Sequence, residues 1–350
     1  MATNPLGFPV PLSVLDLVGL RPQESPASGI ARSVRLAQHV ERLGFTRFWL
    51  AEHHSISGLA CSATSILIGH IAAATSTIRV GSGGIMLPNH APLVVAEQFG
   101  TLAELYPGRI DLGLGRAPGG DFLTMRALRR DSGQTGDDFP ALLAELLGYL
   151  GPEPLDPLPN AVRAIPGHGT NVPITLLGSS TFSATLAARL GLPFAFAAHF
   201  APEYLYAACN LYRDNFRPSQ YLAQPHLIVA TSVIAADTDA EAQRLFTTPQ
   251  QRFLRLIRSQ PVELLPPVDS MTNLWQPWEQ EMVMAKLRTA IVGSPATVAA
   301  GINQLLQDTW ADEIIAVTDT WAPQARLDSF THLAALAPSL VTPNIPVESM

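Results

Sequence analysis

The sequence predicts an α/β fold, a (β/α)8 TIM barrel with insertion loops that takes up residues 1–350 as a single domain. Strand-like and helix-like segments alternate along almost the whole chain. Many of the strand-like segments are continuous apolar runs, as expected for parallel strands that are buried on both faces. Eight strand–helix units fit a chain of 350 residues. A doubly wound sheet is the alternative, but no G-x-G-x-x-G motif opens the first helix.

The first half of the chain contains four of these units. Each strand is predicted from a short apolar run, and each helix from the longer segment that follows it. The first helix is expected to end at Gly44, a residue type that often follows helix C-termini. The predicted strands span 12–17, 47–52, 78–82 and 109–114, and the predicted helices span 30–43, 61–75, 93–105 and 138–150.

The second half supplies the other four units and two proline-rich loops. The loops are predicted over 151–172 and over 260–277, because prolines there interrupt any regular pattern. The predicted strands span 173–177, 194–198, 227–235 and 313–317, and the predicted helices span 183–190, 204–212, 239–259, a segment that follows Ser294-Pro295, and 327–336.

Composition and charge exclude several classes of function. The net charge of −7 argues against nucleic-acid binding, which needs a basic face. No apolar run approaches the roughly 18 residues that a membrane span requires, and residues 1–10 do not resemble a secretory signal. Cys61 and Cys209 are the only cysteines, too few for a disulfide framework or a zinc site. We therefore expect a cytoplasmic protein without nucleic-acid or membrane partners.

A Glu-His-His sequence, residues 52–54, follows the second predicted strand directly. In a barrel of this kind, active residues gather at the C-terminal ends of the strands. His53 is a candidate general acid or base, because imidazole titrates near neutral pH. The alternative is a histidine that caps the strand end through hydrogen bonds. His54 is expected to be structural, since adjacent side chains at a strand end diverge.

The third and fifth predicted strands also end in residues with possible binding roles. Gly83-Gly84 exposes bare backbone against which a flat ring can lie, although a tight turn would use the same residues. Ser179 to Ser183 open a helix directly after a strand, which suits a phosphate as well as an ordinary N-cap. Arg116 follows the fourth strand and can supply a matching cation or form a surface ion pair. Together they favour a phosphorylated flat cofactor such as FMN. The remaining histidines lack metal-ligand spacing, so no metal site is predicted.

Three segments resemble the bacterial luciferase-like flavin monooxygenases, in the same order and with similar spacing. They are Leu50–His54, Val80–Pro88 and Leu105–Arg116. The resemblance covers nearly the whole chain and implies the same barrel, with 260–277 as a mobile lid over its mouth. The family's reactive cysteine is replaced by Gly115, so the chain looks closer to the non-luminous members, including those that tailor aromatic natural products in antibiotic biosynthesis.

The resemblance also implies roles for individual residues. His53 would act in acid–base steps on the flavin–oxygen adduct, and Gly83-Gly84 would form a non-proline cis peptide under the flavin ring. Arg116 would bind the phosphate. The cofactor-binding residues implied in this way are Ser82, Gly83, Gly84, Met86, Arg116, Gly178, Ser179, Ser180 and Ser183.

The resulting hypothesis is a two-component FMN-dependent monooxygenase. It would receive reduced FMN (FMNH2) from a separate flavin reductase, activate O2 as a flavin 4a-(hydro)peroxide, and oxygenate an organic, aromatic or apolar substrate. Relatives in the family pair through the helices beside the second and third strands, which implies a homodimer. Two alternatives stay open: a deazaflavin-dependent oxidoreductase on the same barrel, and a flavin-binding protein without catalytic activity.

Overall fold

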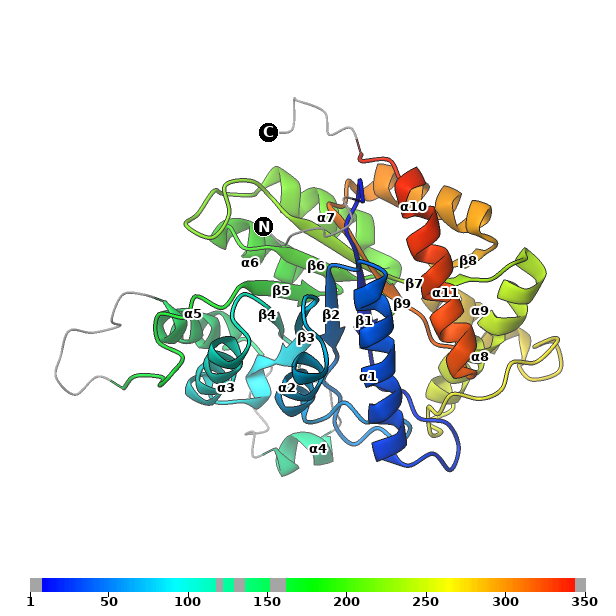
Figure 1. Cartoon of the computed structure of the whole chain (residues 1–350), viewed down its shortest axis with the longest axis horizontal. Coiled ribbons are helices and arrows are strands. Elements are labelled where there is room, and N and C mark those ends of the chain that lie inside the picture. Colours follow the sequence, from blue (N-terminus) through cyan, green and yellow to red (C-terminus); the bar gives the residue numbers. More distant parts are fainter. Residues whose placement is uncertain (1–7, 118–121, 129–135, 152–161, 344–350) are drawn as a thin grey trace.

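In the computed structural model, which describes residues 8–117, 122–128, 136–151 and 162–343, eight parallel strands close into a barrel (Figure 1). Each strand pairs with the next in the order β1 to β7, and β9 completes the ring between β7 and β1. The predicted (β/α)8 fold is therefore confirmed. The barrel strands are β1 (Leu12–Asp16), β2 (Arg47–Leu50), β3 (Arg79–Met86), β4 (Ile110–Gly115), β5 (Ile174–Gly178), β6 (Phe194–Ala197), β7 (Leu227–Ala235) and β9 (Glu313–Val317).

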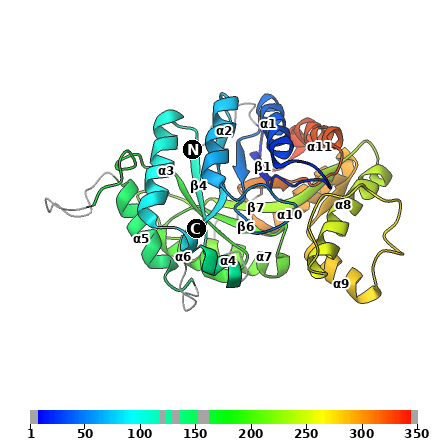
Figure 2. The same cartoon turned by 90° about the horizontal axis from the view of Figure 1, so that it is seen from below.

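Helices surround the barrel, as the view along its axis shows (Figure 2). In the described part of the chain, no helix combines the length and apolar character needed to span a membrane. Residues 152–161 of the predicted loop 151–172 lie outside the described residues. The helices are α1 (Pro26–Arg42), α2 (Thr64–Ala74), α3 (Pro92–Leu105), α4 (Phe122–Ala127), α5 (Phe139–Leu150), α6 (Thr181–Leu190), α7 (Leu205–Asp214), α8 (Asp239–Ile257), α9 (Pro277–Lys286), α10 (Pro295–Thr309) and α11 (Pro323–Leu336).

Prolines mark where several helices begin. The first turn of α1, α3, α5, α9, α10 and α11 contains a proline. A proline in the first turn loses no intrahelical hydrogen bond, because the N–H group there has no helical partner. For this reason α1 and α11 each begin four residues earlier than the predicted starts at 30 and 327.

A short ninth strand, β8 (Ile291–Gly293), lies outside the barrel and was not predicted. It pairs in parallel with the last three residues of β7, Val233 to Ala235. β7 thus extends beyond the ring and supports a second hydrophobic cluster, formed with α8 and α9. These two helices lie together at one side of the barrel (Figure 2). The second cluster comprises Ile234, Ala236, Ala242, Leu245, Phe246, Leu254, Met271, Val283 and Leu287.

A buried ion-pair network joins the N-terminal ends of several barrel strands. Arg47 on β2 donates from Nε and Nη2 to the two oxygens of Glu313 on β9, at 2.7 and 2.9 Å. Its Nη1 donates to Asp111 on β4 at 3.0 Å. A Cβ added at Gly81 would lie 2.6 Å from the Cβ of Asp111, so glycine at this position leaves room for the network. The barrel core is therefore charged at this end and apolar above it.

Candidate active site

The C-terminal ends of the barrel strands form one rim, and β2 brings His53 to it. Its side chain is half-buried and makes no hydrogen bond to any residue that the structure describes. Burial, followed by the positive charge of Arg252, lowers the pKa of His53 to about 4. The ring is therefore neutral at physiological pH and offers one donor and one acceptor nitrogen. At neutral pH it therefore has no acidic proton to supply there.

The Glu52 carboxylate accepts three hydrogen bonds at this rim. Its Oε1 accepts from His54 Nε2 at 2.7 Å and from His90 Nε2 at 2.8 Å, while its Oε2 accepts from the Met86 amide at 3.0 Å. Burial disfavours the charged carboxylate, but these hydrogen bonds outweigh it and lower the pKa of Glu52. This arrangement, which we call the Glu52 clamp (Glu52, His54, His90 and the Met86 amide), ties the end of β2 to the end of β3.

The side chains of Glu52, His54 and His90 also offer three possible metal ligands within 4.8 Å of one another. The sequence did not predict this grouping, because His90 reaches Glu52 only when β3 and the turn after it have folded. Tetrahedral zinc with bonds of about 2.0 Å places its ligand atoms roughly 3.3 Å apart. The separations of 2.7 and 2.8 Å between Oε1 and the two Nε2 atoms are those of hydrogen bonds. The geometry therefore favours a clamp over a metal centre.

The clamp leads to a first prediction. Replacing Glu52 by glutamine preserves its shape but puts an N–H₂ group where one of the acceptor oxygens stood. At least one buried donor then loses its partner, so we expect the free energy of unfolding to fall by about 1–3 kcal/mol. The pKa of His53 should fall further, because the carboxylate of Glu52 favours its protonated ring.

Urea unfolding would measure the stability change, and NMR titration of the histidine ring protons would follow the pKa. Glu145→Gln is the control, because Glu145 is exposed on α5. Unchanged stability of Glu52→Gln would show that the three hydrogen bonds contribute nothing to the folded state.

The end of β3 contains the cis peptide that the family resemblance implied, between Gly83 and Gly84. The pairing of β3 with β4 shifts there, between Ser82 and Ile85, and β3 continues four residues beyond its predicted end. A Cβ on Gly83 would lie 2.7 Å from Leu15 Cδ1, and a Cβ on Gly84 would lie 2.7 Å from the Gly113 carbonyl oxygen. The Gly113 backbone thus excludes a side chain at Gly84, while the Leu15 side chain restricts one at Gly83. The Ser82 hydroxyl, fully buried, donates to the same Gly113 carbonyl at 2.8 Å.

The ends of β4 and β5 bring together groups that could hold an anion. The Arg116 guanidinium stacks on the ring of Phe182, with Cζ 4.2 Å from the ring centroid. Phe182 lies in the first turn of α6, whose N-cap residue Ser180 accepts no hydrogen bond through its side chain. The N–H groups of that turn therefore stay available, and the helix dipole adds to the positive charge of Arg116. Ser179 and Ser183 lie in the same turn region, and Gly178 packs closely against Ser183.

Three further polar side chains face the rim. Arg252 on α8 forms a buried ion pair with Asp319, two residues beyond β9. His199 follows β6, and its Nδ1 is buried without a hydrogen-bond partner in the described chain. Burial lowers the pKa of His199 to about 4, although the Ala230 carbonyl and Asp319 oppose this shift. Neither Arg252 nor Asp319 was predictable from the sequence, because only the folded chain brings α8 to the end of β9.

The segment predicted as a lid, 260–277, is hydrogen-bonded to the loops that follow β1 and β2. The Val262 amide donates to the Ser57 carbonyl at 3.0 Å, and the Leu264 amide donates to the Leu20 carbonyl at 2.8 Å. The side chains of Val262 and Leu264 are buried. The predicted loop ends where α9 begins, at Pro277.

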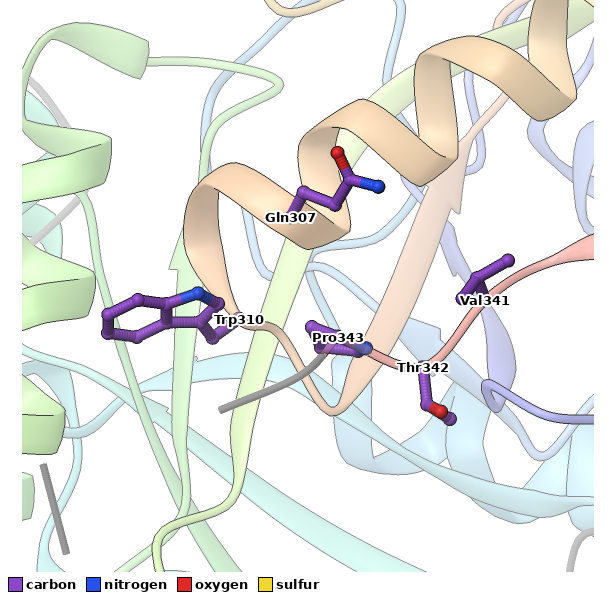
Figure 3. A pocket seen from close by; sticks show the side chains of 5 residues that line it. All are labelled: Gln307, Trp310, Val341, Thr342 and Pro343. Atoms are coloured by element: carbon purple, nitrogen blue, oxygen red, sulfur yellow. The ribbon is translucent and has the colours of Figure 1, made fainter. Parts of the chain in front are cut away.

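A hollow of about 270 Å³ lies at the opposite end of the barrel, near the start of β9 (Figure 3). The residues that line it include Trp310, at the end of α10, and Pro343, near the end of the described chain. None of the predicted site residues contributes to it. It therefore belongs to a different face of the molecule.

Comparison with known proteins agrees with this geometry. The family model described as luciferase-like monooxygenase matches residues 10–313. A luciferase-like monooxygenase of Escherichia coli (strain K12) is 50% identical over 321 residues, 92% of this chain and 95% of that protein. The N-acetyl-S-alkylcysteine monooxygenase of Bacillus subtilis is 39% identical over 240 residues, 67% of this chain and 70% of that protein. The crystal structure of apo-MsnO8 superposes with a TM-score of 0.81 at 36% identity and covers 95% of this chain and 99% of that one. The chain belongs to the luciferase-like monooxygenase family and is a flavin-dependent monooxygenase.

Proposed function

We propose that this protein is the oxygenating component of a two-component monooxygenase. It would take reduced FMN from a separate flavin reductase and use O2 to oxygenate an organic, aromatic or apolar substrate. The observation that carries this proposal is the stack of Arg116 on Phe182 at the N-terminus of α6, on the same rim as His53. A cation beside uncapped helix N–H groups suits the phosphate of FMN, which riboflavin lacks.

The roles of the protein's residues follow from their positions. Arg116, Ser179, Ser180 and the first turn of α6 would bind the phosphate, and the end of β3 would lie beside the flavin ring. Reduced FMN, when bound, supplies the electrons for the reduction of O2. His53, neutral because its pKa is about 4, would exclude water at the rim and have no acidic proton of its own to supply there. The Glu52 clamp would keep the ends of β2 and β3 in register during these events.

The partners follow from the same proposal. A separate reductase is expected, because the sequence contains no nicotinamide-binding motif. We also propose a cytoplasmic homodimer that pairs through α2 and α3. Exposed apolar side chains on these helices are consistent with a second copy there: Ile66 is 72% exposed and Leu105 is 63% exposed. The substrate of the Bacillus subtilis relative, an S-alkyl thioether by its name, is one candidate class.

The phosphate contact gives the decisive test of cofactor binding. Replacing Arg116 by alanine should weaken FMN binding by about 1.5–3 kcal/mol, the usual contribution of a hydrogen bond to a charged group. Riboflavin binding should stay within about twofold of the wild type, because riboflavin carries no phosphate. Fluorescence titration with both flavins, oxidised and reduced, would measure the four affinities.

The reaction with O2 then separates the alternatives. Free reduced FMN is oxidised by O2 on its own, so the proposed monooxygenase should release H2O2 from bound reduced FMN more slowly than free reduced FMN does, whereas a passive flavin-binding protein should not slow it. A deazaflavin-dependent oxidoreductase should bind the deazaflavin cofactor F420 in preference to FMN. Arg126→Ala is the control for Arg116→Ala, since Arg126 lies on α4 in a separate segment. Equal loss of FMN and riboflavin in Arg116→Ala would contradict the assignment of the phosphate site.

A further inference from the structure

Arg252 has hydrogen-bonding capacity that the protein does not use. Arg252 is 7% exposed, and within the described chain its guanidinium donates to one hydrogen-bond acceptor, Oδ2 of Asp319. A guanidinium carries five N–H donors in a planar fork, so four are left without a protein partner. None of these Arg252 nitrogens is fully enclosed without a partner in the described chain, so the free N–H groups are open to water or to a ligand.

His199 presents a second unused group to the same region. Its main-chain N–H donates to the Ala230 carbonyl at 2.9 Å, which fixes the residue at the end of β6. The ring nitrogen Nδ1 is buried without a partner in the described chain. The charges of Arg252 and Asp319 act on His199, and the charge of Arg252 also acts on His53. Arg252, Asp319 and His199 therefore lie near one another and near His53.

We propose that Arg252 and His199 form a subsite that binds an uncharged oxygen acceptor of the organic substrate, such as a ketone, amide or ester carbonyl. This inference rests on the proposed function, since it assigns the substrate side of the same rim. The unused N–H donors of Arg252 bind the carbonyl oxygen, and a neutral His199 ring adds a donor from Nδ1. The subsite holds the substrate beside His53 and takes no part in proton transfer.

The net charge of the subsite favours an uncharged carbonyl over a carboxylate as the substrate group that binds there. Asp319 already neutralises Arg252, and neither His53 nor His199 is charged at neutral pH. A carboxylate substrate would place a second buried anion beside Asp319, with no further cation to offset its desolvation. An uncharged carbonyl accepts the same hydrogen bonds without that cost.

Two probes of nearly identical shape test the inference, benzamide and benzoate. Each would be titrated into the full-length protein at pH 7.5, without flavin or oxygen, and binding followed by saturation-transfer NMR. We expect benzamide to bind at least roughly tenfold more tightly than benzoate. Arg252→Met should weaken benzamide binding by about tenfold or more, as the loss of a charge-assisted hydrogen bond implies. His199→Phe, which keeps the ring volume but removes Nδ1, should weaken it by a smaller factor.

Arg255→Met is the matched control, because Arg255 lies on the same helix but pairs with Glu263. Its benzamide affinity should equal that of the wild type. Benzoate binding as tight as benzamide, no saturable binding of either probe, or full benzamide affinity in Arg252→Met would each overturn the inference. FMN binding and oxygen uptake, measured separately on the same variants, show whether the proposed function stands when the subsite does not.

Discussion

Replacing His53 by alanine is expected to uncouple oxygen consumption from substrate oxygenation while FMN still binds. The groups assigned to the FMN phosphate lie on β4, β5 and α6, so FMN affinity should stay within about twofold of the wild type. Without the neutral imidazole, water enters in its place and can deliver the proton that H2O2 release requires. A positioned acid or base contributes about 10²–10⁴-fold to a rate. Release of H2O2 after mixing the reduced-FMN complex with O2 should therefore accelerate by roughly 10²-fold.

The pH dependence provides a second measurement on His53. Its pKa of about 4 keeps the ring neutral between pH 5 and 8, so H2O2 release should be slow and constant across that range. Release should rise only as the pH falls through about 4, when the ring becomes protonated. Arg252 lowers this pKa while Glu52 raises it, so Arg252→Met should move the transition to higher pH. His70→Ala, at an exposed position on α2, is the control. Wild-type H2O2 release in His53→Ala would exclude the proposed role.

Replacing Arg47 by methionine is expected to lower the free energy of unfolding by about 3–5 kcal/mol. Methionine has a comparable length but no charge, so Glu313 loses its two strongest hydrogen bonds while staying buried. Ser13 and His226 still donate to Glu313, but a neutral hydroxyl and a partly exposed imidazole do not replace a bidentate guanidinium. Asp111 keeps Arg79 as a partner, which limits the loss on that side.

Denaturant unfolding at several pH values would check the Arg47 prediction. Burial alone would raise the pKa of Glu313, but Arg47 and His226 lower it to about 2. The wild type should therefore lose stability as the pH falls from about 4.5 towards 2, because the unfolded chain takes up the proton first. Arg47→Met should lose much of this dependence. The control is Arg244→Met, whose exposed pair with Glu241 should change stability by less than about 1 kcal/mol. An equal effect of the two substitutions would refute the prediction.

The barrel was predictable from sequence because its strands are buried on both faces. An uninterrupted run such as Leu227–Ala235, buried at every position, has few alternatives to a central parallel strand. β8 escaped prediction because three residues, Ile-Val-Gly, are too short to carry a pattern. α9 was missed although Pro277 and Glu279 mark its start, since Gln276 and Glu279 form a reciprocal capping box. The prolines of this stretch predicted only a loop.

The candidate site likewise contains residues whose positions could be predicted from the sequence and residues whose positions could not. His53, Gly83 and Arg116 lie at or just beyond the ends of barrel strands, so their place at the rim follows from the topology alone. Arg252 and His90 lie on other elements, and no spacing in the sequence relates them to His53. Packing gives the two glycines a reason that the sequence did not reveal, since the Gly113 carbonyl excludes a side chain at Gly84 and the Leu15 side chain restricts one at Gly83, independently of any ring. Sequence patterns thus identified polar groups at the strand ends better than those on the surrounding helices and loops.

The extension of β7 beyond the barrel separates two parts of the chain that can diverge independently. His53, Arg116 and the Glu52 clamp stand on the ring itself, where a change of backbone in one strand displaces its neighbours. Arg252 stands on α8, which packs in the second cluster and joins the ring through the last residues of β7. If Arg252 binds the substrate and the rim binds the flavin as proposed, substitutions and insertions between β7 and β9 would alter which substrate is held without disturbing the flavin. Duplicated copies of such a gene would then acquire new substrates through this one interval while the oxygen chemistry is inherited unchanged.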